Sequence, residues 1–134
     1  MKKILILFFV AFVLTGCVSG VSDWNYHLPN NYEVWRINSN SIIIKDMSLQ
    51  KNVSEIPGFV KEFSYNARYV FTRNVESIED NNVFDEKYYV LDTEEKKVYD
   101  ACSSIEELKD LAVNLEIELP TKWYRTSPDP NMSK

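Results

Sequence analysis

The side chains best suited to nucleophilic or metal chemistry in this 134-residue chain are those of two cysteines and one histidine. With only His27, the chain has little material for a metal site of several imidazoles or for a triad that depends on imidazole. His27, Cys102 and an acidic residue could form a catalytic trio by number alone. However, His27 lies in a linker-like segment, and Cys102 lies at a strand-to-helix junction where a small apolar residue often packs. We therefore assign no catalytic residue.

The other cysteine, Cys17, ends a segment that has the layout of a signal peptide. Lys2 and Lys3 make its start positive, and Ile4 to Val13 is an unbroken run of ten apolar residues. A run of roughly 7–15 apolar residues is typical of a signal-peptide core. A transmembrane helix is less favoured, because at about 1.5 Å per residue the run covers only about half of the ~30 Å hydrocarbon layer. We predict that residues 1–16 are removed.

The residues that end this segment, Leu14, Thr15, Gly16 and Cys17, are similar to the lipobox of bacterial lipoproteins. In that motif the cysteine thiol receives a diacylglyceryl group before cleavage. Several acyl chains, such as palmitate, hold a protein on the membrane much more firmly than one chain does. We therefore predict a lipid on Cys17 and a location on the extracytoplasmic face of the cell membrane. The alternative is an ordinary secretory signal, with Cys17 free or paired with Cys102.

The charge of the chain limits its partners. The formal net charge is −5, and removal of Lys2 and Lys3 would make it −7. Nucleic acid is not expected as a partner, because phosphate binding needs clustered Lys and Arg. The basic residues are instead spread singly, which is typical of a solvated surface, as in Arg36, Lys45, Lys61, Arg68, Arg73 and Lys87. The expected partners are the membrane, through Cys17, and a protein at the cell surface.

The mature chain is expected to fold as one domain with a packed core, since 13% of the residues are aromatic. We divide the chain into a signal peptide (1–16), a lipidated cysteine with a tether (17–31), a globular domain (32–120) and a tail that is flexible at its end (121–134). Trp24 and Tyr26 could belong to the tether or to the domain. Trp123-Tyr124 could dock back on the domain or lie at the membrane.

Six strands are predicted as three antiparallel hairpins, because β-branched and aromatic residues alternate on both sides of short polar turns. Most strand aromatics are expected in the core, although an uncovered aromatic face could bind a protein. No internal repeat of convincing length is present, although the strand pairs resemble one another. The predicted pairs are 32–37 with 42–45, 59–65 with 68–73, and 87–92 with 97–99.

Beyond Asp100 the apolar period changes from about two to about 3.6, which predicts a helix. Ser103 or Ser104 can cap its start, with Glu106 or Glu107 completing a capping box, and Leu119-Pro120 ends it. Its apolar stripe comprises Ile105, Leu108, Leu111, Ala112 and Leu115. The fold class is therefore α+β, an antiparallel sheet of about five or six strands packed by one C-terminal amphipathic helix, after a signal peptide.

Two alternative sites, a reactive thiol and a calcium site, depend on this organisation. Cys102 precedes the helix, whose dipole could lower the pKa of the thiol and make it reactive. The acidic residues between 76 and 86 could hold calcium, but they lack the alternating ligands and the glycine of an EF-hand loop. We expect a solvated loop there, comprising Glu76, Glu79, Asp80, Asp85 and Glu86, with no metal and no cofactor.

Four segments of the chain look like a family of small uncharacterised lipoproteins of Gram-positive bacteria: Tyr32 to Ile37, Tyr88 to Thr93, Lys97 to Tyr99, and Ser104 to Leu108. That family is a domain of unknown function, so the resemblance implies an architecture and an envelope location. It transfers no site except the lipobox cysteine. The favoured function is a non-enzymatic binding or accessory module. The alternative is a small cell-envelope hydrolase or redox enzyme that uses carboxylates or Cys102.

Overall fold

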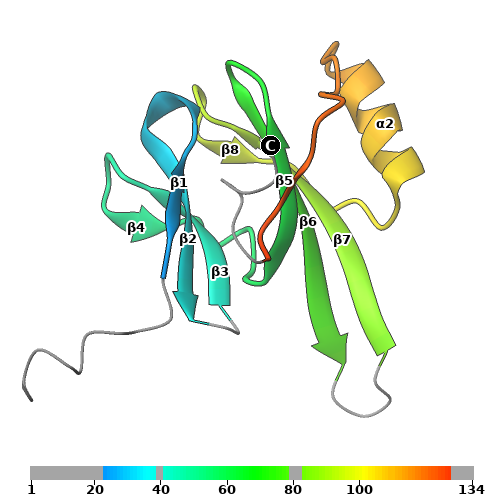
Figure 1. Ribbon diagram of the computed structural model, residues 1–134. Coiled ribbons are helices and arrows are strands. Elements are labelled where there is room, and N and C mark those ends of the chain that lie inside the picture. The colour runs from blue at the N-terminus through cyan, green and yellow to red at the C-terminus, as the bar shows by residue number, and fades with distance from the viewer. Residues whose placement is uncertain (1–22, 39–40, 79–82, 128–134) are drawn as a thin grey trace, which may run out of the picture.

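The computed structural model describes residues 23–38, 41–78 and 83–127, which form two antiparallel sheets and one α-helix. The first sheet has the strand order β1-β2-β3-β4, and the second has the order β8-β7-β6-β5-β9. Figure 1 shows the two sheets side by side, with the helix beyond the second sheet. The prediction of a mainly antiparallel β-structure with one helix is confirmed for these residues. The prediction of a single sheet was wrong.

The first sheet consists of β1 (Asn25–His27), β2 (Tyr32–Asn38), β3 (Ser41–Asp46) and β4 (Lys51–Asn52), with a short 3-10 helix, η1 (Pro29–Asn31), between β1 and β2. The first predicted hairpin is β2–β3. Strand β1 lies in the segment that we assigned to the tether, and the neighbouring Trp24 is buried. The folded part of the chain therefore starts well before Tyr32.

The second sheet consists of β5 (Val60–Tyr65), β6 (Tyr69–Ile78), β7 (Val83–Asp92), β8 (Lys97–Val98) and β9 (Tyr124–Arg125). The other two predicted hairpins are β5–β6 and β7–β8. Strands β6 and β7 also pair with each other, from Tyr69 opposite Asp92 to Ile78 opposite Val83. Most of the predicted acidic loop is therefore strand. Ile78, Val83 and Phe84 favour strands, and the pairing of β6 with β7 extends through them.

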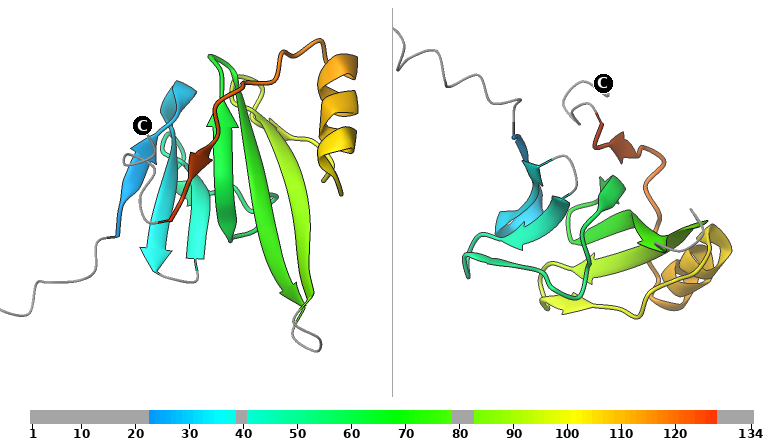
Figure 2. Two further views of the ribbon diagram at one scale, coloured as in Figure 1. Left: turned by 45° about the vertical axis from the view of Figure 1, so that its right-hand side comes forward. Right: turned by 90° about the horizontal axis from the view of Figure 1, so that it is seen from below.

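The core explains why there are two sheets. Apolar side chains from both sheets are buried between them, including Val34, Ile44, Phe63, Val70 and Leu91. In β6 and β7, however, buried apolar residues follow one another directly, as in Val70-Phe71 and Val90-Leu91. Since successive side chains point to opposite faces, both faces of the second sheet are apolar, and another element must pack on each of them. The first sheet covers one side and the helix covers the other, as both views in Figure 2 show.

The helix, α2, runs from Ile105 to Asn114 and follows the predicted stripe, with Leu108 and Ala112 buried. Ser104 is its N-cap, and its hydroxyl accepts a hydrogen bond from the Glu107 amide at 3.2 Å. The helix ends before Leu119-Pro120, because Glu116 adopts a positive φ of 55° and the Ile117 amide donates back to the Ala112 carbonyl at 2.8 Å. This pattern is a Schellman cap. No helix in the described ranges is long and apolar enough to cross a membrane.

The helix is not C-terminal, because the chain continues into β9, which pairs with β5. The hydroxyl of Thr126 is buried and donates to the carbonyls of Val60 and Lys61 at 2.9 and 3.0 Å. The ring of Tyr124 stacks on Phe63 at a centroid distance of 5.4 Å. Trp123-Tyr124 therefore docks back on the domain. Residues 121–127 of the predicted tail belong to the folded structure, and residues 128–134 lie outside the described part.

The two sheets contain similar turns, a feature that we did not predict from the sequence. Tyr32 pairs with Asp46 in the first sheet, as Tyr69 pairs with Asp92 in the second. The carboxylate of each aspartate accepts hydrogen bonds from the backbone amides of the residues two and three positions later. Four positions after each aspartate, a residue with positive φ closes the turn, namely Gln50 at 52° and Lys96 at 53°. The two turns are therefore built alike.

Candidate functional site

The predicted lipidation site lies outside the described residues. Leu14, Thr15, Gly16 and Cys17 precede Asp23, where the description begins. The structure therefore bears on the remaining candidates, which are Cys102, His27 and the acidic residues of β6 and β7.

Cys102 is a buried free thiol on the helix side of the second sheet. Its backbone exchanges two hydrogen bonds with Tyr88, at 2.8 and 2.9 Å, and its side chain packs with Phe71, Val90 and Leu108. Burial raises the pKa of this thiol, and the nearby charge of Glu107 raises it further. The pKa of Cys102 is therefore raised and not lowered as the position before the helix suggested, because desolvation and the Glu107 carboxylate act against the helix dipole.

His27 lies in β1, at the edge of the first sheet, and does not meet Cys102. Its Nδ1 is 2.7 Å from Oε1 of Glu33, while most of its ring is exposed. Glu33 is buried and also accepts a hydrogen bond from Nε1 of Trp35 at 2.9 Å. The predicted trio is therefore not assembled, since the second sheet separates the two residues.

The acidic residues between 76 and 86 are divided between the paired strands β6 and β7 and the segment that joins them. Glu76 and Asp85 face each other in the register of β6 and β7, and Glu86 pairs with Arg73 at 2.8 Å. Glu79 and Asp80 lie outside the described residues. Within residues 23–38, 41–78 and 83–127, no group of three His, Cys, Asp or Glu residues is placed to hold a metal ion.

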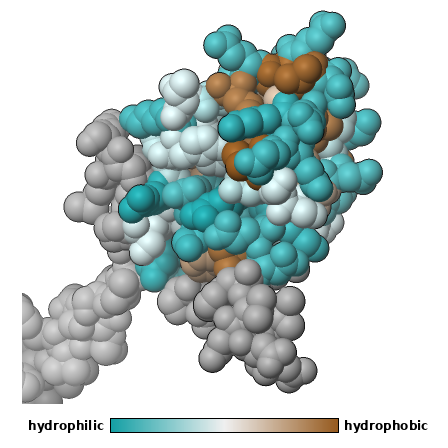
Figure 3. Space-filling view, turned by 90° about the vertical axis from the view of Figure 1, so that its right-hand side faces the viewer, coloured by the Kyte–Doolittle hydropathy of each residue, from teal (hydrophilic) through white to brown (hydrophobic). Residues whose placement is uncertain are grey.

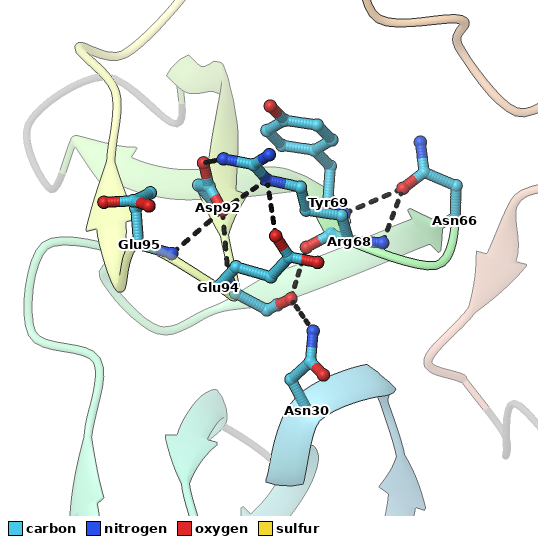
Figure 4. Close-up of polar contacts among 8 residues, drawn as sticks. Asn30, Asn66, Arg68, Tyr69, Asp92, Glu94 and Glu95 are labelled. Atoms are coloured by element: carbon cyan, nitrogen blue, oxygen red, sulfur yellow. Dashed lines mark hydrogen bonds and ion pairs between the residues drawn. The ribbon is translucent and has the colours of Figure 1, made fainter.

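A polar network surrounds Asp92, at the turn between β7 and β8 (Figure 4). Arg68 donates two hydrogen bonds to its carboxylate, from Nε at 3.0 Å and from Nη2 at 2.7 Å. The amides of Glu94 and Glu95 donate to Oδ1, each at 3.1 Å. These bonds, above all those from Arg68, lower the pKa of Asp92. Because both carboxylate oxygens are already engaged, this buried acid holds the turn in shape.

Asp46 has the same role in the first sheet. Its Oδ1 accepts from the Ser48 hydroxyl at 2.6 Å, and its Oδ2 accepts from Nζ of Lys96 at 3.2 Å. Burial by itself raises the pKa of Asp46, but the bonds from Ser48 and Lys96 outweigh burial and lower it. Nearby, burial and the Asp46 carboxylate raise the pKa of Tyr32 to about 12. Asp46, like Asp92, is a structural carboxylate.

Three tyrosines join the two sheets at another place. The hydroxyls of Tyr26 in β1 and Tyr65 in β5 lie 2.8 Å apart, and Tyr124 of β9 lies within 6 Å of both rings. Burial and the bond to Tyr65 raise the pKa of Tyr26. The hydrogen bond from Tyr26, together with the charge of Lys122, lowers the pKa of Tyr124. This cluster packs on Phe63 and fastens β1 to β5.

The candidate binding site is a hollow of about 360 Å³ on the helix-facing side of the second sheet. We call it the Arg73 hollow. The guanidinium of Arg73 lies at its base and bonds Glu62 at 3.0 Å and Glu86 at 2.8 Å. Arg125 lies on the other side of Glu62, with Nε 3.7 Å from Oε1. The hollow is lined by Lys61, Glu62, Arg73, Arg125 and Ser127.

Sequence reasoning missed this hollow. Lys61 and Arg73 stood out only as isolated cations, and Arg125 lay in the predicted tail. Cross-strand pairing sets Glu62 opposite both Arg73 and Arg125, so three strands bring the charges together. Glu62 and Arg73 lie in predicted strands, but the partner strand β9 has only two residues. No periodic pattern marks so short a strand.

The surface outside the hollow offers little apolar area. Among the described residues, the large hydrophobic side chains that are exposed are Ile37, Leu49 and Val113. Figure 3, which views the α2 side of the molecule, shows a mainly hydrophilic face with small apolar areas. Most strand aromatics whose side chains are described are buried or half-buried against the two cores, as in Phe71, Tyr89, Tyr69 and Tyr88. The expectation that most of them build the core is confirmed.

These features define a two-sheet β-protein with one covering helix and a charged surface hollow. The chain belongs to a family described as protein of unknown function (DUF3997), which matches residues 29–122. A search of curated proteins and a search of solved structures each found no match.

Proposed function

We propose that this chain is a lipoprotein, anchored by a lipid on Cys17 to the extracytoplasmic face of the membrane, whose folded domain is a non-enzymatic binding or accessory module. The support for the anchor is the signal-like segment with its lipobox, Leu14 to Cys17. We also propose that the chain is related to lipoproteins of Gram-positive bacteria.

The observation that carries the proposal is how soon the fold begins after Cys17. Trp24 is buried in the core and β1 starts at Asn25. The seven residue-to-residue steps from Cys17 to Trp24 span at most about 25 Å when fully extended. A lipid on Cys17 would therefore hold the domain close to the membrane surface, where it could meet membrane proteins.

The thiol of Cys102 adds support. A disulfide between Cys17 and Cys102 would need both sulfur atoms to meet, but Cys102 is only 6% exposed. Its raised pKa also reduces the thiolate fraction that disulfide formation and redox catalysis need. Both arguments favour lipidation of Cys17 over pairing, and binding over thiol chemistry.

The test is to express the wild type with its native signal in a bacterial host, beside Cys17→Ala and a matched control, Cys102→Ala. We expect the wild type and the control to gain a lipid-sized mass on a chain that starts at Cys17, and to remain with the membrane. Cys17→Ala should stay unprocessed and carry no lipid. A wild type without lipid, or one with a Cys17–Cys102 disulfide, would refute the anchor.

A further inference from the structure

Two exposed cations of the Arg73 hollow, Arg125 and Lys61, make no side-chain hydrogen bond within the described part of the chain, although Arg125 forms a long ion pair with Glu62. Arg73 itself is occupied by Glu62 and Glu86. The side chain of Arg125 is 78% exposed, and its nearest recorded carboxylate oxygen is 3.7 Å away, beyond hydrogen-bond distance. Lys61 is also exposed. Arg125 and Lys61 can therefore donate to an incoming group without breaking a bond of the fold.

The charges of the hollow select one kind of ligand. Among the described residues, three cations and one carboxylate line it, in a chain whose formal net charge is −5, and Glu86 pairs with one of the cations, Arg73. The excess of cations attracts an anion, and an arginine fork matches a carboxylate well. Glu62, however, repels a second negative charge and offers an acceptor to a neighbouring N–H group. A ligand with one carboxylate beside a hydrogen-bond donor satisfies both requirements.

The hollow is also held in shape before a ligand arrives. The segment that carries Arg125 and Ser127 is fixed by the buried Thr126 hydroxyl and by a hydrogen bond of 2.5 Å from the Ser64 hydroxyl to the Lys122 carbonyl. Binding to a preformed site loses less conformational entropy. Its volume of about 360 Å³ lies at the small end of ligand sites, which run from about 300 to 1,000 Å³.

We propose that the Arg73 hollow binds the free carboxyl terminus of a peptide chain. Arg125 and Lys61 hold the terminal carboxylate, and Glu62 accepts the amide N–H next to it. This inference rests on the binding role proposed above and names the chemistry of the ligand. It is independent of the lipid on Cys17.

The test titrates full-length protein in neutral detergent micelles with trialanine as the free acid and, separately, with its carboxyl-terminal amide, while amide NMR spectra are recorded. We expect the free acid to shift the amides of Lys61, Arg125 and Ser127 along a saturable curve, and the amide form to leave them unchanged. Arg125→Gln should weaken binding about tenfold or more, by loss of a charge-assisted contact. Lys109→Gln, a matched change on the exposed side of α2, should leave binding unchanged.

Equal shifts with the acid and the amide, no shift with either, or an Arg125→Gln variant that binds as well as wild type would overturn the proposal. Tighter binding of inorganic phosphate at the same amides would also overturn it, in favour of a phosphate site. The folded spectrum of Arg125→Gln checks that β9 stays docked. Since the mass of the processed chain tests the anchor separately, failure of the titration and failure of lipidation are distinguishable.

Discussion

Nζ of Lys96 lies 3.2 Å from Oδ2 of Asp46 and 2.7 Å from the hydroxyl of Ser48, so a turn of the second sheet donates to a turn of the first. A second link runs in the opposite direction, because the side-chain amide of Asn30 donates to the Thr93 hydroxyl at 2.8 Å. The two equivalent turns are thus joined at one end of the molecule. The tyrosine cluster joins the sheets elsewhere.

The first prediction concerns this link. Lys96→Gln should lower the free energy of unfolding by about 0.5–1 kcal/mol, because the ion pair to Asp46 is partly exposed. The positive φ at this position should be kept, since Gln50 adopts the same conformation in the equivalent turn. Urea denaturation of the variant, with Lys109→Gln on the exposed side of α2 as control, measures the difference. Equal losses in both variants would contradict a specific role for Lys96.

The second prediction is a loss of stability in acid. The pKa values of Asp46 and Asp92 are lowered in the fold from the ordinary value of 3.8. Their contribution is therefore fully present above that value and is lost as the pH falls through the lower folded values. Denaturation at about pH 6 and about pH 3 should show this loss. Asp92→Asn should cost about 1–3 kcal/mol at the higher pH and reduce the difference between the two. An unchanged difference would contradict the assignment.

The third prediction is a loss of stability in alkali. The pKa of Tyr32 is raised from 10.0 to about 12 in the fold. Its contribution is present in full below about pH 10 and is lost as the pH rises toward 12. In Tyr32→Phe the decline of the unfolding free energy over this range should be shallower than in wild type. Tyr99→Phe, a half-buried tyrosine outside the first sheet, serves as control. Parallel curves for wild type and Tyr32→Phe would refute the prediction.

The fourth prediction tests the docking of β9. Thr126→Val keeps the size of the side chain but removes the hydroxyl that donates to the Val60 and Lys61 carbonyls. We expect a loss of about 1–2 kcal/mol, since the buried carbonyls lose a partner. Hydrogen exchange at the amides of Arg125 and Thr126 should also become faster. Thr121→Val changes an exposed threonine and should have little effect on either measurement.

The fifth prediction concerns the buried thiol. In Cys17→Ala, where Cys102 is the remaining cysteine, iodoacetamide should label the native protein at least about tenfold more slowly than the urea-unfolded protein. The native rate should rise mainly at alkaline pH, because the pKa of Cys102 is raised above its ordinary value. Rapid labelling of the folded chain at neutral pH would reopen the case for a reactive thiol.

Part of the fold was predictable from local patterns. The hairpin with its turn at Asn66-Ala67 follows from strand residues on both sides of a turn, and the Asn66 side chain does accept the amides of Arg68 and Tyr69. The start of α2 follows from the Ser104 cap. The full length of β6 and β7 was not predicted, because the acidic residues between 76 and 86 indicated a loop despite the strand-forming residues beside them.

The three hairpins and the helix follow from the sequence, because alternation, turn residues and caps act between neighbours in the chain. The lipobox at Cys17 is likewise a local pattern, and its role stays a prediction. Three features come from tertiary packing: the strands divide into two sheets, β9 returns to β5, and Lys61, Arg73 and Arg125 share one hollow. These depend on side chains far apart in sequence, which meet only when both faces of the second sheet are covered.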